Sequence, residues 1–297
     1  MSGCTLCPRM CMADRENGKI GFCGETSEIR AARAALHMWE EPCISGEKGS
    51  GTVFFTGCTL RCVFCQNHEI AGSKVGKVIT EERLAEILLE LQGKGANNIN
   101  LVTPTHFVPQ IIRALQSAKD QGMYLPVVYN TGGYERVETL KMLDGLVDIY
   151  LPDFKYLNID HAKKYSMAED YPEVAKAALA EMVRQAGKPA FDERGMMKRG
   201  VIVRHLLLPG CLADGKRVVK YLYETYGNRI YMSLMSQYTP LASLDSEKYP
   251  ELNRKVPEYA YEKLVDYAIS LGVTQAFVQE GDTAKESFIP PFTLEGV

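Results

Sequence analysis

The sequence lacks a surplus of positive charge and has no long run of apolar residues. Its 297 residues include 34 Lys and Arg against 37 Asp and Glu, a formal net charge of −3. This balance argues against a basic surface built for nucleic acid or anionic lipid. No apolar run is long enough to span a bilayer, and the first residues lack the basic start and apolar stretch of a secretory signal. We therefore expect a cytoplasmic protein that binds neither membranes nor nucleic acid.

Apart from its cysteines, the chain has the composition of an ordinary globular protein. Hydrophobic residues make up 46% and charged residues 24% of the sequence, and a chain of this length folds as one large domain or two ordinary ones. Most of the nine cysteines lie in two closely spaced sets. Because the cytoplasm keeps thiols reduced, such sets indicate metal or redox chemistry and not disulfides.

Three of the cysteines form a CxxxCxxC run. Cys58, Cys62 and Cys65 follow residues 52–56, a strand-like apolar segment that ends at Gly57. Thiolates are soft ligands that select iron–sulfur clusters, zinc or Cu(I). A [4Fe-4S] cluster normally takes four cysteines, so a cluster held by three keeps one iron open for a ligand that is not protein. Two alternatives stay open, namely a zinc knuckle with a distant fourth ligand and thiols buried as small apolar groups.

The second set lies in the first two dozen residues, at Cys4, Cys7, Cys11 and Cys23. Four thiolates can close a tetrahedral zinc site or hold an auxiliary iron–sulfur cluster. The segment is rich in charged side chains and poor in apolar ones, so we expect a metal to be needed to fold it. Free thiols on a mobile terminus are the alternative, and the sequence does not choose between zinc and iron.

Strand-like and helix-like segments alternate after the cysteine run. This alternation predicts parallel strands joined by right-handed crossovers, and continuous apolar strands fit burial on both faces. The pattern alone fits a partial barrel and a doubly wound sheet equally well. Strands are expected at residues 52–56, 98–103, 126–130, 147–151, 201–208, 229–235 and 275–279, and helices at 80–95, 106–121, 135–146, 159–187, 216–226 and 259–271.

The CxxxCxxC run with Phe64 before its last cysteine resembles the cluster motif of the radical S-adenosylmethionine (SAM) superfamily. The longer string GSGTVFFTGCTLRCVFCQN is similar to the branch related to pyruvate formate-lyase activating enzymes. The resemblance implies an α/β fold, a partial (β/α)6 TIM-like barrel at residues 51–297, after a small Cys-rich segment and linker at residues 1–50. It also implies a [4Fe-4S] cluster, SAM, and an electron donor such as flavodoxin or ferredoxin. The protein binds, aims and shields, and the radical chemistry belongs to the cofactors.

The resemblance extends to three charged residues at strand ends. Asp153 and Lys155 lie two apart, so both project to one side and can bind a zwitterion. In the related enzymes such a DxK pair and an arginine on the next strand contact the methionine part of SAM, which implies this role for Asp153, Lys155 and Arg204. His205 faces the opposite side of a regular strand and is expected to be a packed residue.

Four further residues are implied less directly. The family usually places Gly-Gly-Glu after its second strand to hold the amino group of SAM, whereas this chain has hydroxyl groups there at Thr103 and Thr105. Asn130 falls where related enzymes keep polar contacts, and Phe64 is expected to pack beside the cluster and adenine.

Residues 29–50 are interpreted as a connection between the Cys-rich segment and the barrel, with Trp39 packed under it. His37, Glu40, Glu41 and Cys43 precede the cluster strand, so a place beside the cluster or the substrate is the alternative for them.

The reaction is expected to be hydrogen abstraction from a protein or peptide by a 5′-deoxyadenosyl radical, as in glycyl-radical activases, because an incomplete barrel leaves a side open to a partner's loop. A radical methylase or an enzyme of small molecules is the alternative within the family. Outside it, a zinc-binding interaction module would need only the N-terminal cysteines.

Overall fold

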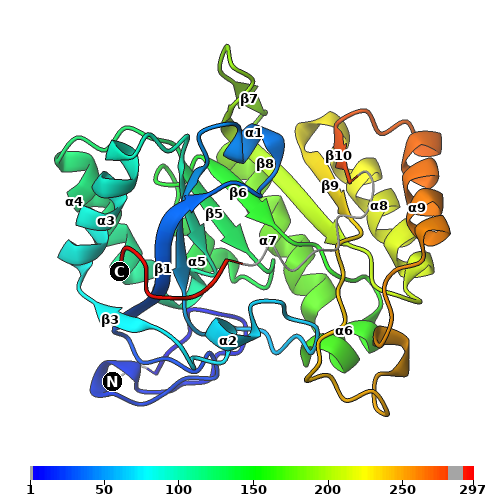
Figure 1. Ribbon diagram of the computed structural model, residues 1–297, viewed down its shortest axis with the longest axis horizontal. Coiled ribbons are helices and arrows are strands. Elements are labelled where there is room, and N and C mark those ends of the chain that lie inside the picture. Colours follow the sequence, from blue (N-terminus) through cyan, green and yellow to red (C-terminus); the bar gives the residue numbers. More distant parts are fainter. Residues whose placement is uncertain (1–2, 280–289) are drawn as a thin grey trace.

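The central feature of the protein is a curved sheet whose main strands run parallel. A computed structural model describes residues 3–279 and 290–297 (Figure 1). The parallel strands lie side by side in their order along the chain, as the alternation predicted. They are β2 (Ser50–Phe55), β4 (Ile99–Val102), β5 (Val127–Thr131), β6 (Ile149–Pro152), β8 (Met197–Leu206), β9 (Tyr231–Met235) and β10 (Ala276–Val278).

Three further strands complete the sheet in the described part of the chain. β1 (Ile29–His37) pairs antiparallel with β2, β3 (Lys77–Ile79) pairs antiparallel with β1, and β7 (Ala190–Phe191) pairs antiparallel with β8. Since β3 and β10 lie at opposite ends of the strand order within residues 3–279 and 290–297, the described sheet is an open barrel. The expected partial barrel is therefore confirmed.

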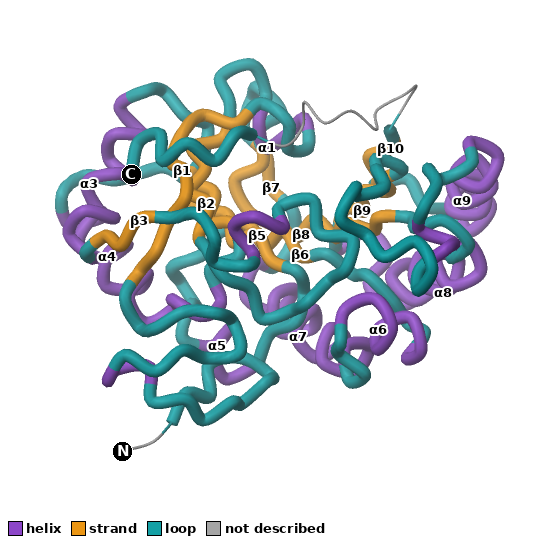
Figure 2. Tube along the Cα trace, turned by 60° about the horizontal axis from the view of Figure 1, so that its bottom comes forward, coloured by secondary structure: helices purple, strands orange, loops and turns teal. Residues whose placement is uncertain are grey.

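The longer helices lie along the outer side of the curved sheet (Figures 1 and 2). None of those in the described part of the chain is long and apolar enough to cross a membrane. The α-helices are α1 (Pro42–Ser45), α2 (His68–Ala71), α3 (Glu81–Gly93), α4 (Val108–Asp120), α5 (Val137–Lys141), α6 (Ile159–Ser166), α7 (Tyr171–Ala186), α8 (Leu212–Tyr226) and α9 (Glu258–Leu271). Single 3-10 turns are η1 (Arg15–Asn17), η2 (Thr105–Phe107), η3 (Gly227–Arg229) and η4 (Pro250–Leu252).

Apolar side chains cover both faces of the parallel strands. Along β5, Val127 and Tyr129 belong to the large core under the helices, whereas Val128 between them belongs to a smaller cluster with Cys43 and Ile44 of α1. This alternation is the period of two that a strand imposes. The strands read as continuous apolar runs because the inner face is also packed.

Two expectations about secondary structure are wrong. Ile29–His37 is not part of an irregular connection but the strand β1, and Trp39 is 57% exposed and not packed under it. The long helix expected at residues 159–187 is two helices, because Met167 ends α6 in the left-handed region at φ 51°. By contrast, Thr80 caps α3 as predicted, its side chain accepting a hydrogen bond from the Arg83 N–H.

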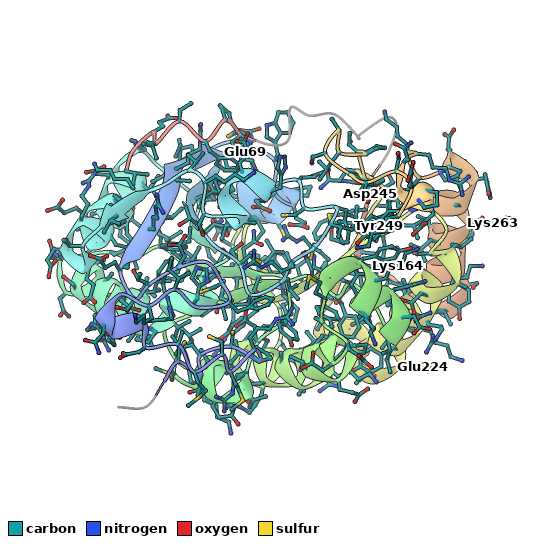
Figure 3. The ribbon with its side chains drawn as sticks, turned by 90° about the horizontal axis from the view of Figure 1, so that it is seen from below. Glu69, Lys164, Glu224, Asp245, Tyr249 and Lys263 are labelled. Atoms are coloured by element: carbon teal, nitrogen blue, oxygen red, sulfur yellow. The ribbon has the colours of Figure 1, made fainter. Side chains whose placement is uncertain are left out.

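Two peripheral segments brace the barrel. On the face seen in Figure 3, Lys164 of α6 lies beside Tyr249, and its ammonium contacts Glu251 at 2.7 Å. Residues 290–297 run along β1, where the Ala34 N–H donates to the Glu295 carbonyl at 2.8 Å (Figure 1). Segments from the second half of the chain thus pack against α6 and against β1.

Candidate active site

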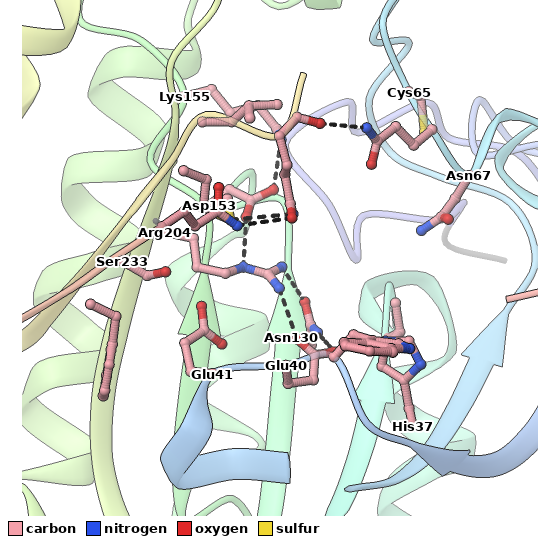
Figure 4. Close-up of a pocket in the computed structure, with 18 of the residues that line it drawn as sticks. His37, Glu40, Glu41, Cys65, Asn67, Asn130, Asp153, Lys155, Arg204 and Ser233 are labelled. Atoms are coloured by element: carbon pink, nitrogen blue, oxygen red, sulfur yellow. Dashed lines mark hydrogen bonds and ion pairs between the residues drawn. The ribbon is translucent and has the colours of Figure 1, made fainter. Parts of the chain in front are cut away.

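A cavity of about 580 Å³ opens at the carboxyl ends of the parallel strands (Figure 4). Its walls come from the loop between β1 and α1, the cysteine loop after β2, and strands β5, β6, β8, β9 and β10. This is the end of a parallel barrel where functional groups collect. The volume lies in the range of sites that hold small molecules and cofactors.

The cysteine run forms a loop at one side of this cavity, and Cys62 and Cys65 line it. The loop is held by the end of α6, because the Val63 N–H donates to the Tyr165 carbonyl at 2.9 Å and the Cys62 Sγ lies 3.0 Å from the Ser166 Oγ. The three thiols therefore occupy one short, anchored loop.

The loop has the donors that a cluster requires. Burial, together with the neighbouring thiols, raises the pKa of Cys58 to about 11 and that of Cys65 to about 12, so these thiols bind metal only with loss of their protons. The Leu60 N–H points at the Cys58 Sγ from 3.4 Å, the kind of contact that tunes a cluster's potential. No three His, Cys, Asp or Glu side chains within residues 3–279 and 290–297 converge on a single metal ion. In a cluster each thiol binds a separate iron, and three thiols on one anchored loop supply the donors for a [4Fe-4S] cluster with one open iron.

The N-terminal cysteines lie together near this loop but differ in exposure. Cys7 and Cys23 are buried, Cys4 is half-buried, and Cys11 is exposed. A Cβ placed on Gly21 would lie 3.4 Å from the Cys23 Sγ and 3.5 Å from the Cys11 Sγ, so these two thiols face a common space.

An ion network centred on Arg204 forms the floor of the cavity (Figure 4). From β8, its guanidinium donates to Asp153 (Nε–Oδ1, 3.0 Å), to Glu40 (Nη1–Oε2, 3.1 Å) and to Asn130 (Nη2–Oδ1, 2.6 Å). The Asn130 amide also donates to the Glu40 Oε1 at 3.1 Å. Three elements distant in sequence are therefore joined by one planar cation.

Asp153 and Lys155 face the cavity together, as their spacing predicted. The Lys155 Nζ lies 2.6 Å from the Asp153 Oδ2 and 5.8 Å from the centre of the Phe64 ring. Burial alone would raise the pKa of Asp153, but the Lys155 and Arg204 cations outweigh it and lower that pKa. Burial would likewise lower the pKa of Lys155, yet Asp153 and Cys62 raise it. All three groups are charged at neutral pH.

Tyr171 of α7 fixes the loops that carry these groups. Its hydroxyl accepts from the Lys155 N–H at 2.9 Å and lies within 3.0 Å of the carbonyl oxygens of Gly132 and Asp153. Gly133 allows this close packing, since it has φ +78° and a Cβ there would lie 2.2 Å from the Asp153 carbonyl.

We expect Gly133→Ala to destabilise the apo protein more than Gly145→Ala. Gly145 has the same φ of +78° but open space around it, so its replacement adds only the left-handed backbone penalty of about 1–2 kcal/mol. Gly133→Ala adds the clash with Asp153, of about 1–3 kcal/mol. Urea unfolding of both variants measures the difference, and equal stabilities would contradict the close approach.

The two threonines expected to hold the SAM amino group lie elsewhere. The Thr105 hydroxyl donates to the Glu135 carboxylate at 2.6 Å, and Thr131 and Tyr129 also donate to this carboxylate. Neither Thr103 nor Thr105 is among the described residues that line the cavity. The hydroxyl of Thr105 is thus committed to a buried carboxyl group that the sequence did not single out.

Glu135 gives the apo protein a pH dependence that the substitution Glu135→Gln removes. Burial raises the pKa of Glu135 from 4.5 to about 7, although three hydrogen bonds oppose the shift. The folded state therefore binds the proton more tightly than the unfolded state. Relative to Glu135→Gln, the wild type should have its highest free energy of unfolding below about pH 4.5. That free energy should fall by on the order of 3 kcal/mol between about pH 4.5 and about pH 7.

Urea unfolding between pH 4.5 and pH 8 tests this prediction. The matched control is Glu262→Gln, which alters an exposed glutamate of α9. A difference in the free energy of unfolding between wild type and Glu135→Gln that stays constant across this range would contradict the raised pKa of Glu135.

Comparison with known proteins identifies the family. A model of the radical SAM superfamily matches residues 52–210, more than half of the chain, including the cysteine loop, β5, β6 and β8. The chain belongs to the radical SAM superfamily. Members of this superfamily are enzymes, and the family implies a [4Fe-4S] cluster and SAM.

Two relatives refine this assignment. The radical SAM chain is 28% identical over 275 residues to the uncharacterized protein MJ0674 of Methanocaldococcus jannaschii, covering 89% of this chain and 74% of the relative. It is 27% identical over 216 residues to the pyruvate formate-lyase-activating enzyme of Clostridium pasteurianum, covering 68% and 79%. The relation to the activating-enzyme branch is thereby confirmed.

A solved structure shows the same fold. The crystal structure of HydG, a maturase of the [FeFe]-hydrogenase, matches with a TM-score of 0.51 at 16% identity, covering 78% of this chain. The radical SAM chain spans about half (52%) of the length of that structure. At this identity the likeness concerns the fold alone.

The segment between β1 and β2 contributes more to the site than the sequence predicted. Glu40 was expected in a connection, but it binds Arg204, 164 positions away, and no spacing in the sequence indicates that pairing. Glu41 and His37 also line the cavity. Cys43 instead packs in the apolar cluster of α1, and His205 donates from Nδ1 to the Phe154 carbonyl at 2.8 Å, on the opposite side from Arg204, as predicted.

Proposed function

We propose that Cys58, Cys62 and Cys65 hold the [4Fe-4S] cluster and that SAM occupies the adjoining cavity. The observation that carries this proposal is that two of these thiols line the same cavity as the cation–carboxylate network of Asp153, Lys155 and Arg204. A zwitterionic amino acid with a sulfonium group needs both signs of charge close to the cluster. The alternative zinc knuckle gives no reason for this network.

In this proposal the chain binds and orients, and the cofactors carry the chemistry. Once bound, they supply an electron to the sulfonium and a 5′-deoxyadenosyl radical that abstracts hydrogen. Lys155 and Arg204 present their cations to the methionine carboxylate, and Asp153 fixes the separation of those cations by bonding to both. Phe64 packs beside the adenine. Thr103 and Thr105 lie outside the described lining of the cavity.

The proposed substrate is a protein or peptide that approaches through the open side of the barrel. Two features support this reading, namely the unclosed strand order from β3 to β10 and the kinship with an enzyme that activates pyruvate formate-lyase. A radical methylase or an enzyme of small molecules would use the same core on another substrate. We further propose a cytoplasmic enzyme reduced by a flavodoxin or ferredoxin, with a second metal site at the N-terminal cysteines.

Anaerobic incubation of the reconstituted protein with dithionite and SAM tests the proposed function. We expect 5′-deoxyadenosine and methionine in equal amounts. Deuterium transfer from a labelled glycine-containing protein into 5′-deoxyadenosine would support the activase reading, and transfer only from a small molecule would favour the alternative. A protein that holds iron and sulfide but leaves SAM intact would contradict the proposal.

A further inference from the structure

The N-terminal segment touches the proposed cluster loop through its own cysteine. The Cys58 N–H donates to the Cys23 carbonyl at 3.0 Å. Gly57, at φ +77°, allows this approach, since a Cβ there would lie 2.7 Å from that carbonyl oxygen. A member of each cysteine set is thus joined to the other by a single hydrogen bond.

Two arginines hold the N-terminal segment against the cysteine loop next to this hydrogen bond. Arg9 donates from Nε to the Thr59 carbonyl at 3.0 Å, and Arg61 donates from Nη2 to the Phe22 carbonyl at 2.6 Å. Both guanidinium groups also lie over the Phe22 ring, within 5.0 Å of its centre. The backbone hydrogen bond between Cys58 and Cys23 therefore lies where the two segments are held together, and not at a mobile terminus.

The N-terminal cysteines range from exposed to buried. Cys11 is exposed, Cys4 is half-buried, and Cys23 is 5% exposed at the contact with the cluster loop. The set therefore extends from the protein surface to the backbone of Cys58. By contrast, two cysteines of the cluster loop face the cavity, where SAM and a substrate would limit access by a donor protein.

Two of the N-terminal thiols, those of Cys11 and Cys23, face a common space beside Gly21. Four thiolates can bind one zinc ion, or each can bind a separate iron of one cluster. Of the two, only a cluster can accept an electron, because zinc has no redox chemistry.

We propose that the N-terminal segment is the electron-entry element of this enzyme. In this inference, which rests on the proposed function, its cysteines hold an iron–sulfur cluster that accepts one electron from a reduced flavodoxin- or ferredoxin-class protein at the exposed Cys11 side. The electron then passes through the backbone of Cys23 and its hydrogen bond to Cys58. The donor is oxidised by one electron, the centre on the cysteine loop is reduced by one, and no bond or proton changes hands.

The experiment compares two reductants on the anaerobically reconstituted full chain. Reduced flavodoxin at stoichiometric amount enters through the proposed site, whereas excess titanium(III) citrate is small and bypasses it. Electron paramagnetic resonance follows the rate at which a SAM-sensitive signal forms. In Cys11→Ala we expect titanium(III) to produce the signal as in the wild type. The rate at which the signal forms with reduced flavodoxin should fall at least about tenfold. Cys211→Ala, which alters a buried cysteine outside both sets, should match the wild type.

A second variant removes no thiol. Gly57→Ala pushes the Cys23 carbonyl away from the loop, so iron content should stay at the wild-type value while the flavodoxin rate falls. One zinc and no extra iron per chain, or equal flavodoxin rates in Cys11→Ala and wild type, would overturn the electron-entry role. Absence of any SAM-sensitive signal in the wild type under titanium(III) would instead overturn the proposed function.

Discussion

Cys62→Ala is expected to abolish SAM cleavage. Cys62 lines the cavity and contacts Ser166 at the anchored end of the loop, and two remaining thiols cannot hold a cube that already has fewer than its usual four cysteines. We expect 5′-deoxyadenosine formation with dithionite to fall by at least about a thousandfold, the scale on which enzymes lose an indispensable group. Chromatography measures the loss of 5′-deoxyadenosine, and an iron assay measures the loss of the cluster.

Two other cysteines provide controls for this experiment. Cys43 is buried in an apolar cluster with Ile44, so Cys43→Ala should keep its iron and its activity. Cys4→Ala should keep part of its activity with dithionite, because a small reductant does not need the N-terminal set. Equal activity of Cys62→Ala and wild type would remove the proposed cluster site.

Arg204→Ala is expected to weaken both the fold and the binding of SAM. Its side chain is 17% exposed and pairs with Glu40 and Asp153. Removing one partner of a buried network leaves uncompensated charges, at a cost of about 3–5 kcal/mol in the free energy of unfolding. The same change removes a cation offered to the carboxylate of SAM. Urea unfolding of the apo protein and calorimetric titration of the reconstituted protein with SAM measure the two effects.

The matched control lies on the same strand. Arg199 of β8 is exposed, so Arg199→Ala should change stability by no more than about 0.5 kcal/mol. Arg204→Lys should fall between the two, because lysine keeps the charge but not the planar fork that reaches three acceptors. Wild-type stability and SAM affinity in Arg204→Ala would contradict the network.

The parallel strands and most of the helices were predictable because their local patterns and their tertiary positions agree. Thr80 signals the start of α3, and β5 reads as a buried strand from its apolar run. β1 was missed because its alanine-rich sequence carries no strong strand propensity. Its place is set by pairing with β2, which is a tertiary interaction.

In the candidate site, too, residues marked by a local pattern were predictable and residues placed by tertiary contacts were not. Asp153 and Lys155 were predictable from their spacing at a strand end, and the structure places both at the cavity. Glu40 was not, because its partner on β8 is brought near only by folding. Glu135 was not predictable for a related reason, since the hydroxyl groups of Thr105 and Thr131 that donate to it are brought together only by folding.

The most direct test of the account is electron paramagnetic resonance of the reduced, anaerobically reconstituted protein with and without SAM. A reduced [4Fe-4S] signal that changes when SAM is added is the predicted result, and Cys62→Ala should lack that change. A wild-type protein whose cluster signal is the same with and without SAM would contradict the central claim, since no iron would then be open to the cofactor.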